Sequence, residues 1–401
     1  MDRRSFAALL AAPMLAPALR LAEGALGNRV RQGVNPPDDV FMKDLGRIME
    51  IAGVPGIAMG VVRDRRLAWQ HYQGVMDTRT NERVSADTMW PAASLSKPVF
   101  ALAVLRLVDE GKLDLDRPLK SYAPGHAPDD ARGDTITARH VLSHSSGLRN
   151  WRNRTDQPLV PAFDPGTRFQ YSGEGIYYLQ HAVERITDMP FARFIEERLL
   201  APLGMTSSTY LWNKEAATRL VSGHDQGQVR TVYNKEYIAQ LERYADAQHR
   251  AVADFRHEDM VAAVQAFTPP QPPVPNFLVP NAAGSLLTTV GDYSAFLVEL
   301  LYGGNKAVDL APRTLTMMTT PQTRINSALS WGLGVGIEES ARDGSFLWHW
   351  GDNGAWKNFM VAHPRTGSAL VVFTNGSRGL NVARRAVAAA TGDERAAFLW
   401  L

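Results

Sequence analysis

The chain of 401 residues contains no cysteine, has a formal net charge of +2, and is 45% hydrophobic and 21% charged. The lack of cysteine excludes disulfides, thiolate metal sites and a cysteine nucleophile. The small net charge gives no case for binding nucleic acid or an anionic membrane. The composition is typical of a soluble globular enzyme, and the length allows two or more regions around sizeable cores.

Residues 1–27 have the pattern of a cleaved export signal. Arg3 and Arg4 precede Ser5, and residues 7–19 are small or apolar. That run is too short to cross a bilayer, which needs about 20 apolar residues. A basic start followed by a short apolar segment favours export, and the paired arginines resemble a twin-arginine signal. We therefore predict an exported, periplasmic protein, with a frayed amphipathic N-terminal helix as the alternative.

A helix and a strand hairpin are predicted next. Residues 36–52 show helical spacing of apolar side chains, with Asp38 or Asp39 as the candidate cap. Residues 57–62 and 67–75 read as two strands joined by a charged turn. A hairpin therefore precedes the segment around Ser94.

The segment that begins at Ser94 carries the strongest indication of chemistry. A helix is predicted to start near Ser94, because apolar residues recur at helical spacing between 99 and 108. Lys97 follows on the same face of that helix. A serine nucleophile needs an adjacent base, and a lysine is such a base once its pKa falls from about 10.4. Taken alone, the pattern is also that of an ordinary capped helix.

The middle of the chain reads as mainly helical. Helices are predicted at 136–142, from 176 to 186, and at 191–200. Residues 224–280 form an insert in which the charged, helix-prone stretch 233–267 leads into the Pro-rich stretch 269–275. This insert is either a solvated surface element or a lid over a site.

The C-terminal part returns to strands. A helix is predicted at 290–302, a glycine-rich strand at 330–337, three strands at 346–350, 358–363 and 369–374, and a helix at 381–390.

The expected fold is α/β (α+β): an antiparallel five-stranded sheet flanked by N- and C-terminal helices, with an inserted mainly helical region. The predicted regions are 36–115 together with 282–401 for the sheet, and 116–281 for the helices. The active site is expected in the cleft where they meet.

These stretches resemble the serine β-lactamase and penicillin-recognising superfamily, in its branch of class C β-lactamases, D-amino-acid peptidases and family VIII esterases. Three motifs stand in order: Ser94-Leu95-Ser96-Lys97, Tyr171-Ser172-Gly173 and His349-Trp350-Gly351. The stretches 141–148 and 202–205 resemble the segments that follow the first and second motifs.

The resemblance implies a role for each matching residue. Ser94 is the expected acylated nucleophile, and Lys97 helps to remove its proton. Tyr171 relays a proton to the leaving group, and His349 tunes the proton affinity of Tyr171. The oxyanion hole is expected from the backbone N–H groups of Ser94 and Asp352.

Three further residues, Trp350, Gly351 and Gly173, are expected to contact substrate. No metal and no cofactor are implied. The expected partner is a small-molecule ester, amide or β-lactam, without nucleic acid or a stable membrane anchor.

The second motif departs from the family pattern Tyr-x-Asn, because Gly173 has no side-chain amide. This favours an esterase-like hydrolase. A class C-type β-lactamase or D-amino-acid peptidase is the alternative, and a non-catalytic binding protein on the same scaffold is a further one.

Two other patterns have rival interpretations. His140 and His144 have the spacing of a zinc pair, but a structural role is favoured because no glutamate follows in the required pattern. Four tryptophans near the third motif form either an acyl pocket or part of the core; they are Trp331, Trp348, Trp350 and Trp356.

Overall fold

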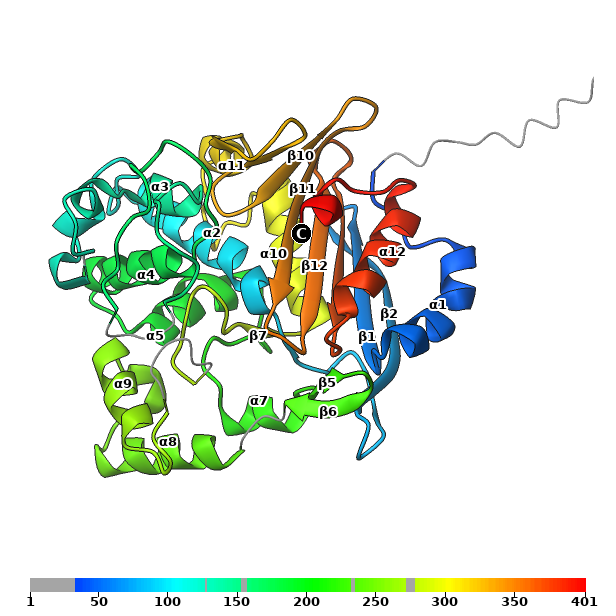
Figure 1. Ribbon diagram of the computed structural model, residues 1–401, viewed down its shortest axis with the longest axis horizontal. Helices are drawn as coiled ribbons and strands as arrows, with labels where there is room; N and C mark the ends of the chain where they lie inside the picture. The colour runs from blue at the N-terminus through cyan, green and yellow to red at the C-terminus, as the bar shows by residue number, and fades with distance from the viewer. Residues whose placement is uncertain (1–32, 127, 153–156, 232–234, 272–277) are drawn as a thin grey trace, which may run out of the picture.

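The computed structural model describes residues 33–401 apart from 127, 153–156, 232–234 and 272–277 (Figure 1). The predicted export signal and part of the Pro-rich stretch 269–275 lie outside the described residues. Among the residues that are described, no helix has the length and apolar character needed to cross a bilayer.

One antiparallel sheet organises the molecule. Its nine strands follow the order β3-β2-β1-β13-β12-β11-β10-β9-β8, so the first and last parts of the chain meet where β1 pairs with β13 (Figure 1). The strands are β1 Gly56–Arg63, β2 Arg66–Asp77, β3 Glu82–Arg83, β8 Thr323–Arg324, β9 Leu329–Trp331, β10 Gly336–Ser340, β11 Gly344–Asp352, β12 Lys357–His363 and β13 Ser368–Thr374.

The fold class is confirmed, but the predicted count of five strands is wrong. The stretch predicted as one strand at 330–337 is a hairpin, in which β9 pairs with β10. Gly334, in the turn, has φ +90°, and a Cβ there would lie 2.4 Å from the Cβ of Ala101. Only glycine suits a left-handed backbone packed this closely against a helix. The remaining additions, β3 and β8, are two-residue edge strands without a readable apolar pattern.

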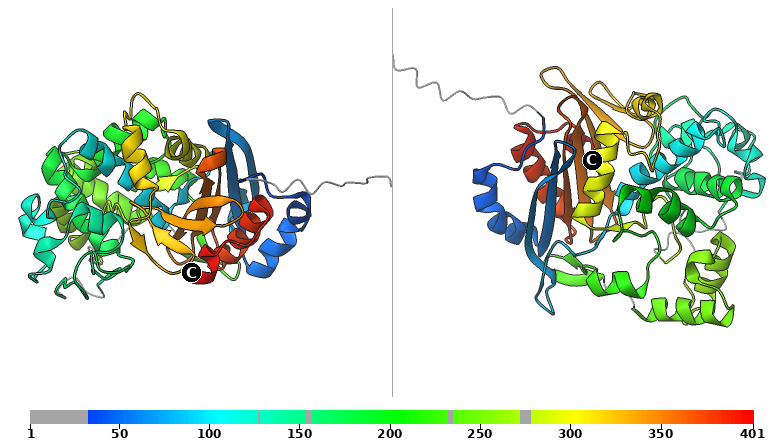
Figure 2. Two further views of the ribbon diagram at one scale, coloured as in Figure 1. Left: turned by 90° about the horizontal axis from the view of Figure 1, so that it is seen from above. Right: turned by 180° about the vertical axis from the view of Figure 1, so that it is seen from behind.

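Both faces of the sheet are covered, so side chains that point to either face of its central strands are buried. Along β13 every residue is buried. Leu370 and Val372 pack in one core with α1 (Asp39–Ala52) and α12 (Gly379–Thr391). Val371 and Phe373 belong to the opposite core with α2 (Ser96–Asp109) and α10 (Val290–Tyr302), since successive strand residues point to opposite faces. Figure 2 shows α10 on the face opposite α1 and α12.

The first helix begins and ends as its sequence indicates. Asp38 is the cap residue of α1, and its carboxylate accepts the N–H of Phe41 at 2.9 Å. Gly53 closes the helix in the left-handed conformation. The bounds of α10 are those predicted from the sequence.

The second part of the molecule is mainly helical. It lies on the side of the sheet where β10 and β11 are found, to their left in Figure 1. Its α-helices are α3 Ala138–Leu142, α4 Gly173–Thr187, α5 Phe191–Ile195, α6 Ala201–Leu203, α7 Lys214–Arg219, α8 Lys235–Ala247 and α9 His257–Gln265, with α11 Pro312–Met318 nearer the sheet. Short strands are β4 Trp90–Pro91, β5 Gly223–Asp225, β6 Gln228–Thr231 and β7 Leu287–Thr288.

Helices of the insert predicted at 224–280 contribute to a third, small hydrophobic core. Side chains of α8 and α9 pack with one another and with Trp212 and Met89, a residue that lies five positions before Ser94. The members from these helices are Ile238, Leu241, Ala245, Met260, Ala263 and Val264. Helices α8 and α9 of the insert therefore pack together on one apolar face.

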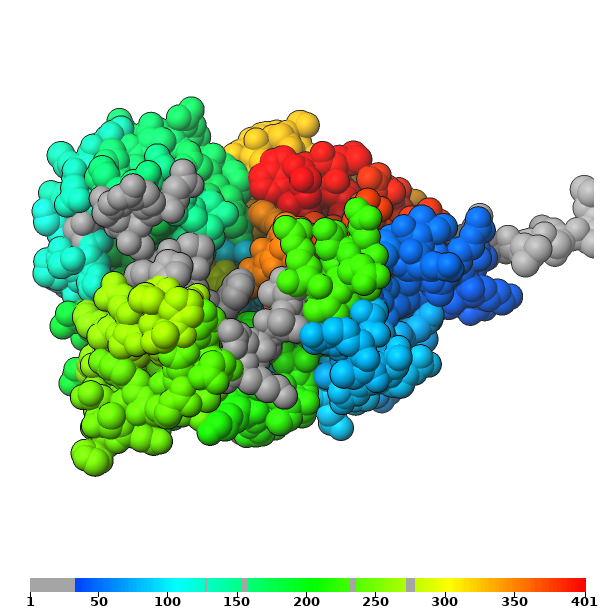
Figure 3. Space-filling model, turned by 60° about the horizontal axis from the view of Figure 1, so that its bottom comes forward, coloured from blue at the N-terminus to red at the C-terminus, as the bar shows by residue number. Residues whose placement is uncertain are grey.

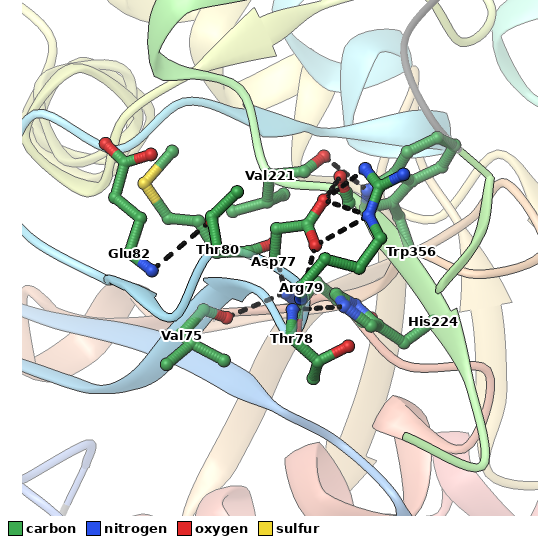
Figure 4. Close-up of polar contacts among 12 residues, drawn as sticks. Val75, Asp77, Thr78, Arg79, Thr80, Glu82, Val221, His224 and Trp356 are labelled. Atoms are coloured by element: carbon green, nitrogen blue, oxygen red, sulfur yellow. Dashed lines mark hydrogen bonds and ion pairs between the residues drawn. The ribbon is translucent and has the colours of Figure 1, made fainter. Parts of the chain in front are cut away.

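A partly buried polar cluster ties the start of the insert to the sheet (Figure 4). The Asp77 carboxylate, at the end of β2, accepts hydrogen bonds from Arg79 and from the Ser222 hydroxyl, the latter at 2.6 Å. The Arg79 guanidinium is the main cause that holds the pKa of Asp77 far below its usual range. The His224 ring accepts the N–H of Thr78 at 3.3 Å. These bonds fix β5 against β2.

Candidate active site

Ser94 lies in a tight turn rather than in the predicted α-helix. A 3-10 turn (η1, Ala93–Leu95) precedes α2, which begins at Ser96. Ala93 has φ +52°, a left-handed conformation that costs a non-glycine residue of order 1 kcal/mol. Strain of this kind persists only where the surroundings impose it, and it is concentrated at functional sites.

Buried hydrogen bonds impose this turn. The Ser96 hydroxyl donates to Ala93 O at 2.6 Å and accepts the N–H of Leu286 at 3.0 Å. Two buried phenols donate to the carbonyls of the same turn: Tyr210 to Ser96 O at 2.7 Å, and Tyr293 to Leu95 O at 3.1 Å. Ser94 is thus held by a rigid frame.

The amine of Lys97 lies directly beside the Ser94 hydroxyl. Lys97 Nζ is 2.9 Å from Ser94 Oγ and donates to Ala283 O at 2.7 Å. The lysine is 1% exposed. Burial lowers the pKa of Lys97 to about 7, because the charged amine is disfavoured away from water. A neutral amine is therefore available near neutral pH.

Tyr171 completes a triangle with these two residues. Lys97 Nζ lies 4.8 Å from the centre of the Tyr171 ring. The phenol oxygen of Tyr171 is buried and has no partner in ordinary hydrogen-bond geometry. The Ser94 side chain is nevertheless close enough to lower the pKa of the phenol. Burial outweighs this effect and raises the pKa of Tyr171 well above its usual value. The phenol is therefore protonated at neutral pH.

Two neutral histidines flank Tyr171. His349 Nδ1 donates to Trp350 O at 2.7 Å, which leaves Nε2 with a lone pair. Burial lowers the pKa of His349 to about 3. His349 thus supplies no positive charge to Tyr171, and it affects the phenol only as a neutral ring 6.1 Å away, centre to centre.

His144 is the second of these rings. Its centre lies 4.2 Å from that of Tyr171, and its Nδ1 accepts the N–H of Ser172 at 3.1 Å. The proton of neutral His144 is then on Nε2, the opposite tautomer to His349. His140 instead bonds through Nδ1 to the N–H of Thr137 in the cap of α3, so the two histidines of the zinc-like spacing have different partners.

The third motif approaches the Ser94 turn closely because it contains Gly351. A Cβ on Gly351 would lie 2.3 Å from Ala92 O and 3.2 Å from the Cβ of Ala93. Any side chain here would push β11 away from η1. The glycine therefore brings the end of β11 against the turn that holds Ser94.

The register of β11 directs the N–H of Asp352 away from β12. Asn353 N–H donates to Trp356 O at 3.1 Å, so the preceding pair, Asp352 with Lys357, is of the non-hydrogen-bonded type. The N–H of Asp352 consequently points away from β12, and the neighbouring Gly351 is the residue that contacts the Ser94 turn. The Asp352 carboxylate turns the other way, to Lys357 Nζ at 2.5 Å.

Gly173 lies two residues after Tyr171, at the point where α4 begins. It is buried at the start of α4, and Asn150 Oδ1 accepts its N–H at 2.9 Å. A Cβ on Gly173 would lie 2.5 Å from the Trp151 ring. Trp151 therefore fills the space that a side chain at 173 would need, a relationship that sequence reasoning missed because the Trp151–Gly173 contact is not local in the chain.

The four tryptophans near the third motif divide into two groups. Trp331, Trp348 and Trp356 are at most 1% exposed and belong to the core. Trp350 is half-buried and lies 4.6 Å from Tyr171, ring centre to ring centre. Only Trp350 of the four thus has the exposure expected of a substrate contact.

Comparison with known proteins agrees with this geometry. Residues 42–392 match the family model described as Beta-lactamase. Esterase EstB of Burkholderia gladioli is 32% identical over 176 residues, which cover 36% of this chain and 44% of EstB. Penicillin-binding protein 4 of Amycolatopsis lactamdurans is 30% identical over 186 residues, 43% of this chain and 49% of that protein. The chain thus spans less than half of each of these two relatives.

Solved structures share the fold at low identity. The octameric penicillin-binding protein homologue from Pyrococcus abyssi has a TM-score of 0.68 and 20% identity, over 89% of this chain and 78% of that chain. The D-alanine carboxypeptidase AmpC from Burkholderia cenocepacia has a TM-score of 0.64 and 17% identity, over 86% and 97%. Since the family model spans residues 42–392 of 401, the chain belongs to the beta-lactamase family.

Proposed function

We propose that this protein is a serine hydrolase that cleaves ester or amide bonds, preferably esters, through an acyl-enzyme on Ser94. The observation that carries the proposal is the buried amine of Lys97, 2.9 Å from Ser94 Oγ with its pKa lowered to about 7. A base of this proton affinity, in contact with a hydroxyl, meets the requirement for nucleophilic catalysis near neutral pH.

In the proposed acylation, neutral Lys97 accepts the Ser94 proton as Oγ attacks the substrate carbonyl. The N–H groups of Ser94 and Asp352 stabilise the tetrahedral oxyanion. Tyr171, which is protonated, donates its proton to the leaving alcohol or amine and recovers one from the Lys97 ammonium group. Water then attacks the acyl-enzyme by the reverse of these transfers, so that Lys97 and Tyr171 return to their starting forms.

Esters are the favoured substrates for two reasons. Gly173 provides no side-chain amide to hold an acylamino group, and Trp151 occupies the adjacent space. An ester is also intrinsically easier to cleave than an amide, because an alkoxide leaves more readily than the anion of an amine. The printed name of the relative EstB, an esterase, is consistent with this preference. Hydrolysis of β-lactams or D-amino-acid peptides is the second candidate, supported by the family and by the names of other relatives.

The test is the mass of the intact protein after exposure to p-nitrophenyl butyrate, a fluorophosphonate and nitrocefin. We expect one adduct on Ser94, absent in Ser94→Ala, and faster turnover of the p-nitrophenyl ester than of nitrocefin. Ser327→Ala, an exposed serine, is the matched control and should behave as the parent protein. Failure of all three reagents to label the protein would leave a non-catalytic binding role; faster turnover of nitrocefin would reverse the preference.

Export to the periplasm is a further part of the proposal. It is supported by the sequence of residues 1–27 alone. Cell fractionation of the full chain tests it: replacement of Arg3 and Arg4 by lysine should retain the protein in the cytoplasm if the signal is of the twin-arginine type.

A further inference from the structure

The last helical turn of the chain lies beside the candidate active site. It is α13, Ala397–Trp400, drawn in red near the C-terminus in Figure 1. The Trp400 ring makes edge-to-face contacts with Trp350 at 5.6 Å and with Phe169 at 5.7 Å between ring centres. Trp350 in turn contacts Tyr171. A residue from the end of the chain therefore adjoins the aromatic side of the site.

Specific contacts with the sheet hold this turn in place. The N–H of Ala397 donates to the Glu338 carboxylate on β10 at 3.2 Å. Arg395, which is 3% exposed, lies 3.7 Å from the same carboxylate and stacks over Phe346. Phe398 stacks on Phe359 of β12 with ring centres 4.1 Å apart. Trp400 thus has a defined position before any ligand binds.

The aromatic side chains here are not fully covered. Trp348, beneath them, is 1% exposed, whereas Phe169, Trp350 and Trp400 are each half-buried. In Figure 3 the red C-terminal residues adjoin the orange residues of the last strands, where the surface is hollowed toward the helical region. Partly exposed aromatic rings beside polar catalytic groups are typical of a site that binds an apolar part of a ligand.

We propose that Trp400, with Trp350 and Phe169, forms an aromatic wall that binds the apolar alcohol group of an ester substrate. The position of Tyr171 indicates on which side of the scissile bond the wall contacts the substrate. Trp350 packs on that tyrosine, which protonates the leaving group in the proposed function on which this inference rests. The wall therefore contacts the leaving alcohol rather than the acyl group, and Trp400 is a specificity-determining residue for bulky or aromatic alcohols.

A series of acetate esters tests the wall, because all of them yield the same acetyl-enzyme. We expect kcat/KM of the parent protein to increase from methyl to benzyl to naphthyl acetate. Trp400→Ala should lose about tenfold or more in kcat/KM for naphthyl acetate, since contacts with an apolar group of this kind are worth at least that much. It should leave methyl acetate nearly unchanged, and Trp400→Phe should keep most of the preference.

The matched control is Leu399→Ala, the neighbouring residue, which is 73% exposed and should retain the parent preference. An equal loss on methyl and naphthyl acetate, or an unchanged preference in Trp400→Ala, would overturn the wall. If Trp400→Ala does not fold, Trp400→Leu replaces it, and the same loss in kcat/KM for naphthyl acetate is expected. Labelling of Ser94 by a fluorophosphonate in each variant separates the two proposals: labelling without loss of preference refutes only the wall, whereas no labelling of the parent protein refutes the hydrolase.

Discussion

Lys97 Nζ lies 4.8 Å from the centre of the Tyr171 ring, and the same burial acts on the two groups in opposite ways. It lowers the pKa of the amine to about 7 and raises that of the phenol far above neutrality. Burial favours the neutral form of each group, so the resting site holds a neutral base and a neutral acid at the same time. In the proposed mechanism this division gives proton removal to Lys97 and proton donation to Tyr171.

The first prediction concerns the pH dependence of activity. Because protonated Lys97 has no lone pair, kcat/KM for an ester should fall about tenfold per pH unit below its pKa and level off above it. The value of about 7 places the bend near neutral pH. A pH profile with p-nitrophenyl acetate measures this, corrected for spontaneous hydrolysis. An acid limb with its midpoint near 3 would instead indicate His349 as the essential base.

The second prediction is that Lys97→Met inactivates the protein but stabilises it. The pKa of Lys97 is lower in the folded state than the value of about 10.4 in an unfolded chain. The unfolded state therefore binds more protons between these two values, and stability is lost as pH falls through that window. Urea unfolding near pH 7 and near pH 10 should show a gain for the variant of order 1 kcal/mol or more at the lower pH only. A destabilised variant at neutral pH would contradict the argument.

The third prediction tests the close approach of β11 to the nucleophile turn. Gly351→Ala places a Cβ 2.3 Å from Ala92 O, which must displace the strand. We expect kcat to fall about 10²-fold or more, the usual effect of a lost oxyanion donor. The control is Gly291→Ala in α10, where the nearest atom to the new Cβ is 3.8 Å away. The Gly291→Ala variant should keep full activity. Equal activity of both variants would contradict the prediction, because it would show that displacing β11 does not affect the proposed oxyanion donor.

The fourth prediction concerns the missing amide of the second motif. Gly173→Asn alone should not create β-lactamase activity, because Trp151 occupies the space. It should lower the melting temperature, since overpacking typically costs about 1–3 kcal/mol. The double variant Trp151→Gly with Gly173→Asn should recover stability relative to Gly173→Asn. Nitrocefin turnover and thermal unfolding of all three proteins measure this. A stable, nitrocefin-active single variant would refute the steric argument.

The fifth prediction concerns acid stability and a cluster of histidines between α4 and α9. The rings of His126 and His181 stack at 3.8 Å, and His257 lies 4.5 Å from His181. Burial lowers the pKa of His181 to about 3 and that of His257 to about 4. Below the unfolded pKa of about 6.5 the unfolded chain binds protons that the native cluster does not, so stability falls with pH.

Other groups face this cluster, and one of them opposes the effect. Glu258, Arg185 and Tyr177 adjoin the rings. Burial raises the pKa of Glu184 to about 7, so its proton uptake stabilises the folded state as pH falls. His181→Phe removes one of the acid-sensitive groups and keeps a stacked ring. The drop in melting temperature between about pH 7 and about pH 5 should be smaller in His181→Phe than in the parent protein. A larger drop would contradict the assignment.

Local pattern was enough to predict much of this molecule. Helical or alternating spacing of apolar residues predicted α1, α10 and the strands β1, β2, β11, β12 and β13, because these periods are set by neighbouring residues. The spacing of Ser94 and Lys97 predicts their contact for the same reason, because side chains three residues apart meet across a helical turn.

Tertiary structure alone decided the remaining features. The number of strands depended on the β9–β10 turn, where Gly334 packs against Ala101 of another element. The proton affinity of Lys97 depended on burial, the space beside Gly173 on Trp151, and the aromatic wall on Trp400. Burial and contact between distant segments exist only once the chain has folded, so the order of residues specified which chemical groups were present, and packing determined the state in which each one acts.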